Sequence, residues 1–340
     1  MFDIKRLKEN VKPSDDKVEC PVGGCGTKVK KMEKGDLKLL DSYLVKRKSD
    51  EEKQKFEDYL CKQHKIYVTP STFIYENFGD NLLWYNGKDK EVFDQIFEVK
   101  RVKAQLYHDN SEDAVTWNIF RFLERNGLIE GFLGLLIGTG LKSSEVIYWS
   151  YSQKEHNTWS PLKEARDEFG EEEQRGSEPD IIIKTDKALF FVEAKLTAGN
   201  ETCPSDKSNS KEYEKGGGNW FSKVFDSNYT TVAIKKKKYE LMRFWLLGTW
   251  IAEKLRLDFY LLNLVLSERE PCIEEVFRQH INENEQRHFQ RVTWESIYEG
   301  ILKSNLPRDK EIMLDYFRNK AIGYENGKLQ RAFSIPDNGT

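Results

Sequence analysis

The chain has 340 residues, of which 38% are hydrophobic and 13% aromatic, so it can bury a sizeable core and does not have the composition of a disordered chain. Its net charge of −3 still allows a nucleic-acid partner, because a local basic groove matters more than the sum. No stretch reaches the roughly 18–20 apolar residues that span a bilayer. The first residues lack the apolar core of a secretory signal, so we expect a cytoplasmic protein with no membrane partner.

The amino-terminal part divides into a polar tail and a region rich in lysine. Residues 1–18 show no apolar periodicity and predict a flexible tail. Residues 19–75 open with the segment CPVGGCG, continue with a helical pattern over 32–66 and end in short apolar runs. We interpret 19–75 as a small zinc-binding region.

Four metal-ligating side chains form two half-sites in this region, Cys20 with Cys25 and Cys61 with His64. Three thiolates and one imidazole suit tetrahedral Zn²⁺, and a closed set of four ligands is structural. The segment between the half-sites is long for a compact finger. The alternative is unrelated free thiols and a surface histidine, since cysteine is often a small buried hydrophobe.

The middle of the chain predicts the order helix, strand, strand, strand, helix, strand between residues 111 and 267. Asn110 or Ser111 can cap the first helix, and Gly127 can end it. This order predicts an α/β (α+β) fold in which helices flank a mixed central sheet. The strands are expected at 143–153, in a hairpin within 177–196 and at 257–267, with a solvated acidic loop at 164–176 and a long polar loop at 197–233.

The hairpin, SEPDIIIKTDKALFFVEAKL, joins two apolar runs through Asp186-Lys187. A two-residue turn there places Asp180 opposite Glu193, and Lys195 shares the face of Glu193. The turn lacks the preferred glycine, and a slip of one residue would separate the set.

The charged residues of the hairpin are costly on strands that are apolar on both faces. Two adjacent carboxylates repel, and one binds a proton unless a cation lies between them. A divalent ion with oxygen ligands removes the conflict. The alternative is an exposed hairpin in which Asp180 caps a strand and Glu193 and Lys195 form a surface pair that contributes little.

Pro179-Asp180 followed by Glu193-Ala194-Lys195 resembles the PD-(D/E)xK nuclease superfamily, over about residues 111–267. The resemblance implies a restriction-endonuclease-like αβββαβ core, placed within 76–270, and a carboxy-terminal extension over 271–340. It implies a nuclease that depends on Mg²⁺ or Mn²⁺ and hydrolyses phosphodiester bonds. Asp180 and Glu193 would hold the metal, and Lys195 would orient the attacking water.

The resemblance also implies contributions from the helices on either side of the hairpin. Glu112 would be a third acid at the metal, although an acid in a first turn is also favoured by the helix dipole. Tyr239, Arg243 and Lys238 are candidates for contact with phosphate, although a lysine run is more often a solvated helix start.

The resemblance implies a nuclease, and we expect it to be a DNA endonuclease. A chain without a helicase or ATPase motif suits restriction or phage defence better than processive repair. The alternatives are a non-catalytic nucleic-acid-binding module on the same fold and an RNA-cleaving nuclease. A homodimer would suit the cutting of both strands, but no heptad pattern supports one.

Overall fold

The computed structural model describes residues 7–11, 14, 16–46, 50–69, 71–99, 105–172, 176–205, 210–305 and 309–335. The chain forms two compact units, each assembled from separated segments. The first unit contains residues 1–85, 103–122 and 301–340, and the second contains 86–102 and 123–300. The predicted linear boundaries at 19–75, 76–270 and 271–340 stay a prediction. Within the described ranges, no helix is both long and apolar enough to cross a membrane.

The second unit is built around a seven-stranded mixed sheet with the order β12-β11-β10-β9-β6-β7-β8. β10 is parallel to β11 and β11 to β12, whereas the other neighbours are antiparallel. This sheet confirms the predicted fold class. The strands are β6 (Glu145–Tyr148), β7 (Tyr151–Ser152), β8 (Asn157–Thr158), β9 (Ile181–Lys184), β10 (Ala188–Ala194), β11 (Asp258–Val265) and β12 (Arg287–Thr293).

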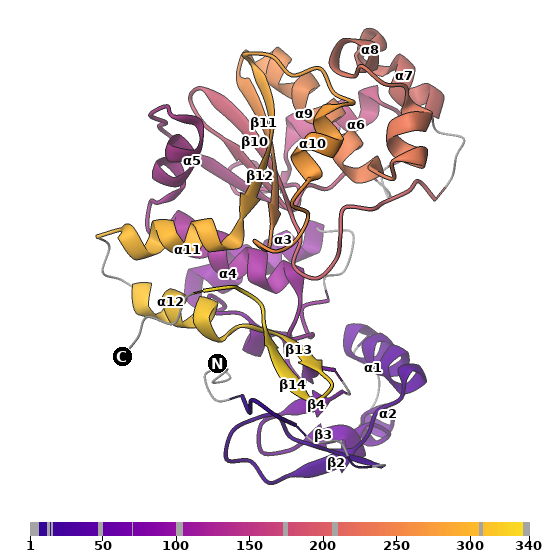
Figure 1. Cartoon of the computed structure of the whole chain (residues 1–340), viewed down its shortest axis with the longest axis vertical. Coiled ribbons are helices and arrows are strands. Elements are labelled where there is room, and N and C mark those ends of the chain that lie inside the picture. The colour runs from indigo at the N-terminus through magenta and orange to yellow at the C-terminus, as the bar shows by residue number, and fades with distance from the viewer. Residues whose placement is uncertain are drawn as a thin grey trace. The chain divides into compact units, whose positions relative to one another are not determined.

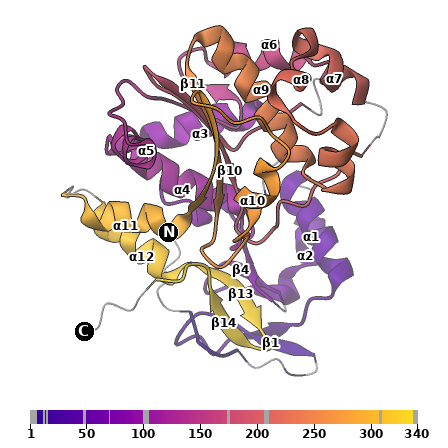
Figure 2. The same cartoon turned by 45° about the horizontal axis from the view of Figure 1, so that its top comes forward.

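Helices cover both faces of this sheet (Figures 1 and 2). On one face lie α6 (Ser160–Glu168), α9 (Tyr239–Leu255) and α10 (Ile273–Arg278), and on the other lies α5 (Ile129–Ile137). Alternate residues of the strands, among them Ile182, Leu189 and Phe191, are fully buried in the core beneath α9. The helices α3 (Gly87–Val99), α7 (Ser210–Asn219) and α8 (Phe221–Val224) complete the unit.

Several sequence predictions for this unit are wrong in detail. The acidic segment 164–176 is helical through Glu168, in α6. The polar segment 197–233 contains α7, α8 and the start of a π-helix, η6 (Thr230–Lys235). The glycines of this segment do not form an unconstrained loop. Gly217 has a φ of 59°, and a Cβ there would lie 2.9 Å from Phe169 and Trp250. The extension after residue 270 supplies α10 and the edge strand β12.

The first unit combines small sheets with helices from both ends of the chain (Figure 1). Helices α4 (Glu112–Arg125) and α11 (Trp294–Lys303) contribute residues to both units, and Ser111 caps α4 as predicted, accepting from the Ala114 amide at 3.2 Å. The other elements are β1 (Lys17–Glu19), β2 (Lys28–Lys30), α1 (Lys34–Lys46), α2 (Asp50–Gln54), η2 (Glu57–Tyr59), β3 (Leu60–Cys61), β4 (Ile66–Val68), β5 (Phe73–Tyr75), η3 (Phe78–Asn81), α12 (Lys310–Asn319), β13 (Ala321–Glu325) and β14 (Lys328–Arg331).

The amino-terminal tail is ordered where the structure describes it. Leu7 and Val11 are buried, and Leu7 forms a β-bridge with Val22. The Leu329 amide of β14 donates to the Glu9 carbonyl at 2.9 Å. The prediction of a flexible tail is therefore wrong for residues 7–11, because pairing with the far end of the chain is invisible to local periodicity.

A fully buried ion pair joins three separated segments of the first unit. Lys320 and Asp109 are each 1% exposed, and the Lys320 Nζ lies 3.2 Å from the Asp109 Oδ1. The same ammonium also donates to the Asp109 carbonyl and, at 3.4 Å, to the Asn81 Oδ1. Because the ammonium is shared among several oxygens, its burial is tolerated and the three segments are held together.

Replacement of this lysine should strongly destabilise the first unit. Lys320→Met leaves the Asp109 carboxyl group buried without its cation, which typically costs about 3–5 kcal/mol. Lys62→Met is a matched control, since Lys62 is paired with Glu57 at the same 3.2 Å but its side chain is 71% exposed. Urea denaturation should show a large decrease in the free energy of unfolding for Lys320→Met and little change for Lys62→Met. Equal decreases would contradict the role assigned to Lys320.

Candidate active site and metal centre

The β9–β10 hairpin has the register predicted from its two-residue turn. Val192 pairs with Ile181 and Leu189 pairs with Lys184, and the Thr185 amide closes the turn on the Ala188 carbonyl at 2.9 Å. The same register, continued by one step, places Asp180 opposite Glu193. The Asp180 Oδ2 accepts from the Ala194 amide at 2.8 Å, so this carboxylate also caps the end of β10.

Glu193 and Lys195 lie at the buried end of β10, 3% and 9% exposed. The Lys195 ammonium donates to the Glu193 Oε1 and, at 3.2 Å, to the Oε2 of Glu240 in the first turn of α9. The surface-pair alternative is therefore wrong. The sequence did not predict a role for Glu240 in this site. The only local indication is its position beside Tyr239 at the start of a predicted helix.

The protonation of the two glutamates differs because their surroundings differ. Burial raises the pKa of Glu193 well above its usual range; Lys195 opposes this shift, and Glu240 and Asp180 add to it. Burial also acts to raise the pKa of Glu240, but Lys195, a hydrogen bond with Glu193 and the charge of Arg243 outweigh it and lower that pKa. In the absence of a metal, Glu193 therefore retains a proton more readily than Glu240 does.

Asp180 is oriented by a turn that the sequence did not signal. The predicted strand 143–153 reverses at Trp149 and Ser150, whose φ angles are 43° and 76°. Two consecutive positive φ angles are typical of a tight hairpin turn, which glycine and asparagine usually occupy. The Trp149 indole donates to the Asp180 Oδ1 at 3.3 Å, and the buried Arg166 holds the turn through the Ser150 Oγ at 2.7 Å.

A second polar cluster fixes the segment that leads into Asp180. Glu171, with its side chain 1% exposed, accepts from the backbone amide and the hydroxyl of Ser177 and from the Tyr213 hydroxyl. Arg243 of α9 lies 4.0 Å from this carboxylate, and its guanidinium lies 4.8 Å from the ring centre of Tyr239. The expectation of a solvated acidic loop is therefore wrong at Glu171, which links α9 to the hairpin.

The remaining predicted site residues are placed as follows. The Tyr239 hydroxyl lies 3.2 Å from that of Tyr213, within the Glu171 cluster. Lys238 is 7% exposed at the start of α9. Glu112 is half-buried in the first turn of α4 and belongs to the first unit, so its part in the site stays a prediction. Contacts of Tyr239, Arg243 and Lys238 with phosphate also stay predictions.

The predicted cysteine–histidine set is brought together in the first unit. Cys20 and Cys25 lie between β1 and β2, and Cys61 and His64 lie at the turn between β3 and β4. One ligand atom from each of the four residues lies within 4.8 Å of all the others, and the three cysteines are buried. The two half-sites therefore form one cluster that could hold a metal ion.

The spacing of the cluster fits a tetrahedral ion. Zinc–ligand bonds of about 2.3 Å to sulfur and about 2.0 Å to nitrogen imply edges of roughly 3.8 Å between sulfurs and roughly 3.5 Å from sulfur to nitrogen. The Cys25 and Cys61 sulfurs are 3.9 Å apart, and the His64 Nδ1 lies 3.6 Å and 3.5 Å from those of Cys20 and Cys61. Burial raises the pKa of the Cys20 thiol, so a bound cation would have to displace its proton.

The mixed sheet, with two acids and a lysine at the end of its central hairpin, defines a protein of the restriction-endonuclease-like class. The family described as restriction endonuclease associating with ARP matches residues 38–320, and the chain belongs to this family. No curated protein and no solved structure matches the chain.

The raised pKa of Glu193 predicts a pH-dependent stability without divalent metal. Its proton stabilises the fold below the ordinary carboxyl pKa, and this contribution is lost as the pH rises through the raised value. Because Glu193→Gln cannot ionise, its melting temperature relative to the natural protein should increase as the pH rises above the ordinary carboxyl pKa. Asp186→Asn, at the exposed turn of the same hairpin, should show no such trend, and a flat difference for Glu193→Gln would refute the prediction.

Proposed function

We propose that the chain is a nuclease that depends on Mg²⁺ or Mn²⁺ and hydrolyses phosphodiester bonds in DNA. The observation that carries the proposal is the meeting of Asp180, Glu193 and Lys195 at one buried end of β10. A pure binding module has no need for acids that converge on a buried lysine.

The charges of the site favour a divalent ion. Asp180, Glu193 and Glu240 would carry three negative charges when ionised and Lys195 one positive charge, which leaves a balance that a divalent cation neutralises. Asp180 and Glu193 are the residues that would hold it, and one or two carboxylates with water and phosphate oxygens are a usual set for Mg²⁺. Bound there, the ion would make hydroxide available near neutral pH and neutralise charge on the phosphoryl group.

The other residues of the site complete the proposal. Lys195 would orient the water and stabilise the pentavalent phosphate, and Glu240 would hold the ammonium in place through its 3.2 Å contact. Glu112 is proposed as a third acid, and Tyr239, Arg243 and Lys238 as contacts to the phosphate backbone.

The setting is proposed from the family description. A role in restriction or phage defence, association with ARP and a cytoplasmic location would suit it. A homodimer is proposed only because a duplex has two strands to cut.

We further propose that the metal of the Cys20, Cys25, Cys61 and His64 cluster is structural zinc. Support comes from the ligand chemistry and from edges that fit a tetrahedron. In the part of the chain that the structure describes, this is the one group of three or more His, Cys, Asp or Glu side chains that could together hold a metal ion.

Cleavage should require the hairpin residues. The assay incubates plasmid, single-stranded DNA and RNA with Mg²⁺, Mn²⁺ or no added metal. Asp180→Ala and Lys195→Ala should each lower the rate at least about 100-fold, since groups that stabilise charge at the reacting centre are typically worth about 10²–10³. Nucleic-acid binding should persist in both variants.

The matched control is Lys187→Ala, because Lys187 lies at the exposed turn of the same hairpin. Its rate should equal that of the natural protein. If the natural chain binds nucleic acid but cleaves no substrate, the non-catalytic binding module is favoured. Selective cleavage of RNA would show that the substrate is RNA and not DNA.

Elemental analysis tests the zinc proposal. The purified protein should contain one zinc per chain, and Cys20→Ser and Cys61→Ser should lose it, because each removes a ligand from a closed set of four. Cys203→Ser should keep the metal, since Cys203 is exposed and lies outside the cluster. Zinc-free natural protein would end this assignment.

A further inference from the structure

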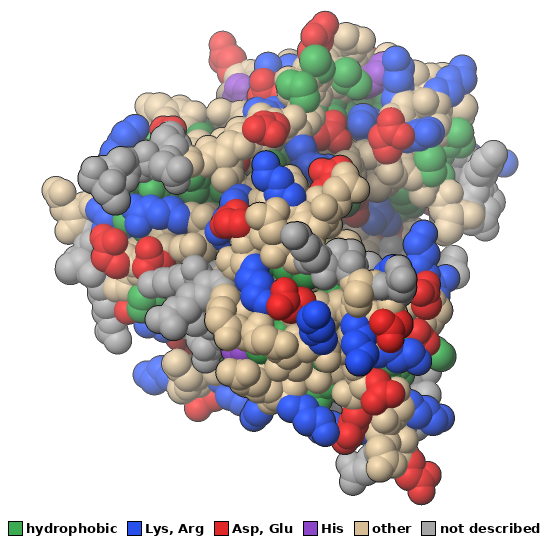
Figure 3. All heavy atoms as spheres, turned by 60° about the horizontal axis from the view of Figure 1, so that its bottom comes forward, with side chains coloured by type: hydrophobic (Ala, Val, Ile, Leu, Met, Phe, Trp, Pro, Cys, Tyr) green, Lys and Arg blue, Asp and Glu red, His purple; other side chains and the backbone are tan. Residues whose placement is uncertain are grey.

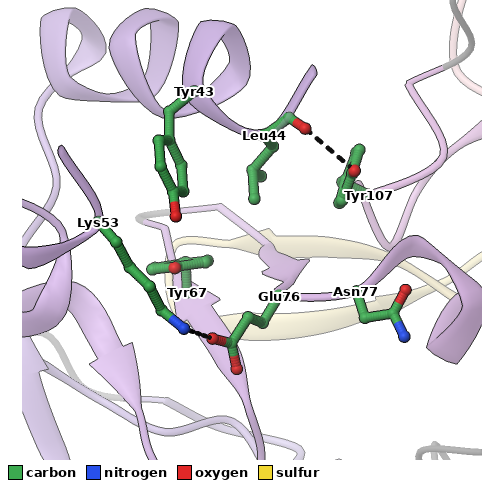
Figure 4. A pocket seen from close by; sticks show the side chains of 7 residues that line it. All are labelled: Tyr43, Leu44, Lys53, Tyr67, Glu76, Asn77 and Tyr107. Carbon is green, nitrogen blue, oxygen red and sulfur yellow. Dashed lines mark hydrogen bonds and ion pairs between the residues drawn. The ribbon is translucent and has the colours of Figure 1, made fainter. Parts of the chain in front are cut away.

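A separate pocket of about 250 Å³ lies in the first unit and is not part of the hairpin site. Three tyrosines line it, Tyr43 from α1, Tyr67 from β4 and Tyr107. The polar side chains of Lys53, Glu76 and Asn77 complete it. Figure 4 shows Tyr43 reaching towards Tyr67, with the Lys53–Glu76 pair on the other side of the Tyr67 ring.

The aromatic walls are held in place by contacts with neighbouring residues of the same unit. The ring of Tyr43 packs against Phe56, with 5.5 Å between the ring centres. The Tyr107 hydroxyl donates to the Leu44 carbonyl at 3.0 Å, and Tyr67 is 1% exposed within the core of this unit. A ligand would therefore meet preformed aromatic surfaces, which lowers the ordering cost of binding.

One polar atom at the base of the pocket is unsatisfied by the protein. The Tyr67 hydroxyl is buried and has no hydrogen-bond partner among the described residues. Buried hydroxyl groups are normally paired, and an exception needs an explanation. A ligand that exchanges a hydrogen bond with this hydroxyl provides one.

The charge and size of the pocket define the ligand. The Lys53 Nζ lies 2.7 Å from the Glu76 Oε1, so the two charges neutralise each other at the wall. A phosphate would need an unpaired cation and an alkylammonium group an unpaired carboxylate, so the balance favours a neutral ligand. The volume lies just below the roughly 300–1,000 Å³ of clefts for drug-sized molecules, which suits a single planar ring system.

We propose that this pocket binds one unstacked nucleobase of a single-stranded or locally opened nucleic acid. Stacking on tyrosine and hydrogen bonds to the base edge are the usual means of recognising splayed bases. The half-buried rings of Tyr43 and Tyr107 supply the first, and the Tyr67 hydroxyl, the ion pair and the Asn77 amide supply the second. The choice of a nucleic acid as the ligand rests on the proposed function.

One face of the molecule carries charged groups of both signs. Figure 3 brings this face forward, and its coloured side chains mix lysine and arginine with aspartate and glutamate. Among the residues shown in colour there, basic groups do not form one continuous patch. Affinity on this face would then depend less on phosphate contacts, which dominate non-specific binding.

The zinc cluster would stabilise the pocket. Cys61 and His64 lie on the turn that leads into β4, which carries Tyr67. The Glu76 amide donates to the Lys65 carbonyl, next to His64, at 2.9 Å. A metal bound to Cys61 and His64 would therefore fix the hairpin from which Tyr67 and Glu76 extend.

The test measures binding of the full chain, without added divalent metal, to a fluorescein-labelled single-stranded 12-mer and to an abasic 12-mer of the same charge. The natural protein should prefer the base-bearing strand by about 5-fold to 150-fold, the range for one stacked base. Tyr43→Ala should abolish this preference, and Tyr67→Phe should weaken binding of some homopolymers more than others, because only an edge contact is lost.

Tyr59→Phe is the matched control, because Tyr59 lies in the same core and its hydroxyl is already paired with Asp36 at 3.0 Å. It should bind as the natural chain does. Zinc content and melting temperature identify any variant that fails to fold. If a tyrosine variant fails to fold, Glu76→Gln is used in its place and should also lower the preference for the base-bearing strand.

Equal binding of the two strands, no binding of either, or a preference that survives both tyrosine changes would overturn the pocket assignment. The proposed nuclease fails separately. Preference for the base-bearing strand without any cleavage would reject the proposed nuclease activity but support base binding in the pocket. Metal-dependent cleavage without that preference would support the nuclease and reject base binding in the pocket.

Discussion

The register of β9 against β10 is the constraint on which the candidate active site depends. It is fixed by apolar side chains, since Ile182, Leu189 and Phe191 are fully buried against the helices on one face. Glu193 follows Phe191 by two residues and so lies on that same face. A slip of one residue would carry Glu193 to the opposite face and exchange the apolar side chains packed in the two buried faces, so the packing of the core also enforces the meeting of charges at its end.

Those charges do not stabilise the fold by themselves. Glu193 has a raised pKa although Lys195 is its hydrogen-bond partner, which means that burial and the neighbouring acids outweigh the lysine. The backbone conformation of Trp149 is also unfavourable for the folded state, because a bulky residue with a φ of 43° is rare outside strained turns. Unfavourable features of this kind persist only where the surrounding structure over-determines them, here through Arg166 and Glu171. Their concentration around Asp180 is typical of functional sites.

The sequence predicted what depends on local pattern. A two-residue turn between apolar runs was enough for the hairpin register, and the spacing of Cys20, Cys25, Cys61 and His64 was enough to group them. Glu171 and Glu240 could not be found this way, because acidic residues look alike in sequence and only the packing of α9 decides that Glu171 is buried and that Glu240 pairs with Lys195. The order of residues 7–11 could not be predicted for the same reason, since Glu9 and Val11 pair with Leu329 and Gly327, more than 300 positions away.

The zinc cluster and the aromatic pocket extend this logic to the first unit. The strands β1 to β5 of this unit are only two or three residues long, too short to hold a register by pairing alone. A metal that ties the turn between β3 and β4 to the turn between β1 and β2 would supply the missing constraint, as structural zinc does in small domains with little core. Tyr67 follows His64 by three residues, so its hydroxyl would be positioned by the same ligand set. A buried, unpaired hydroxyl is unfavourable, and the stabilisation from the metal site would offset that cost. Such an arrangement is reasonable only if a ligand completes the pocket.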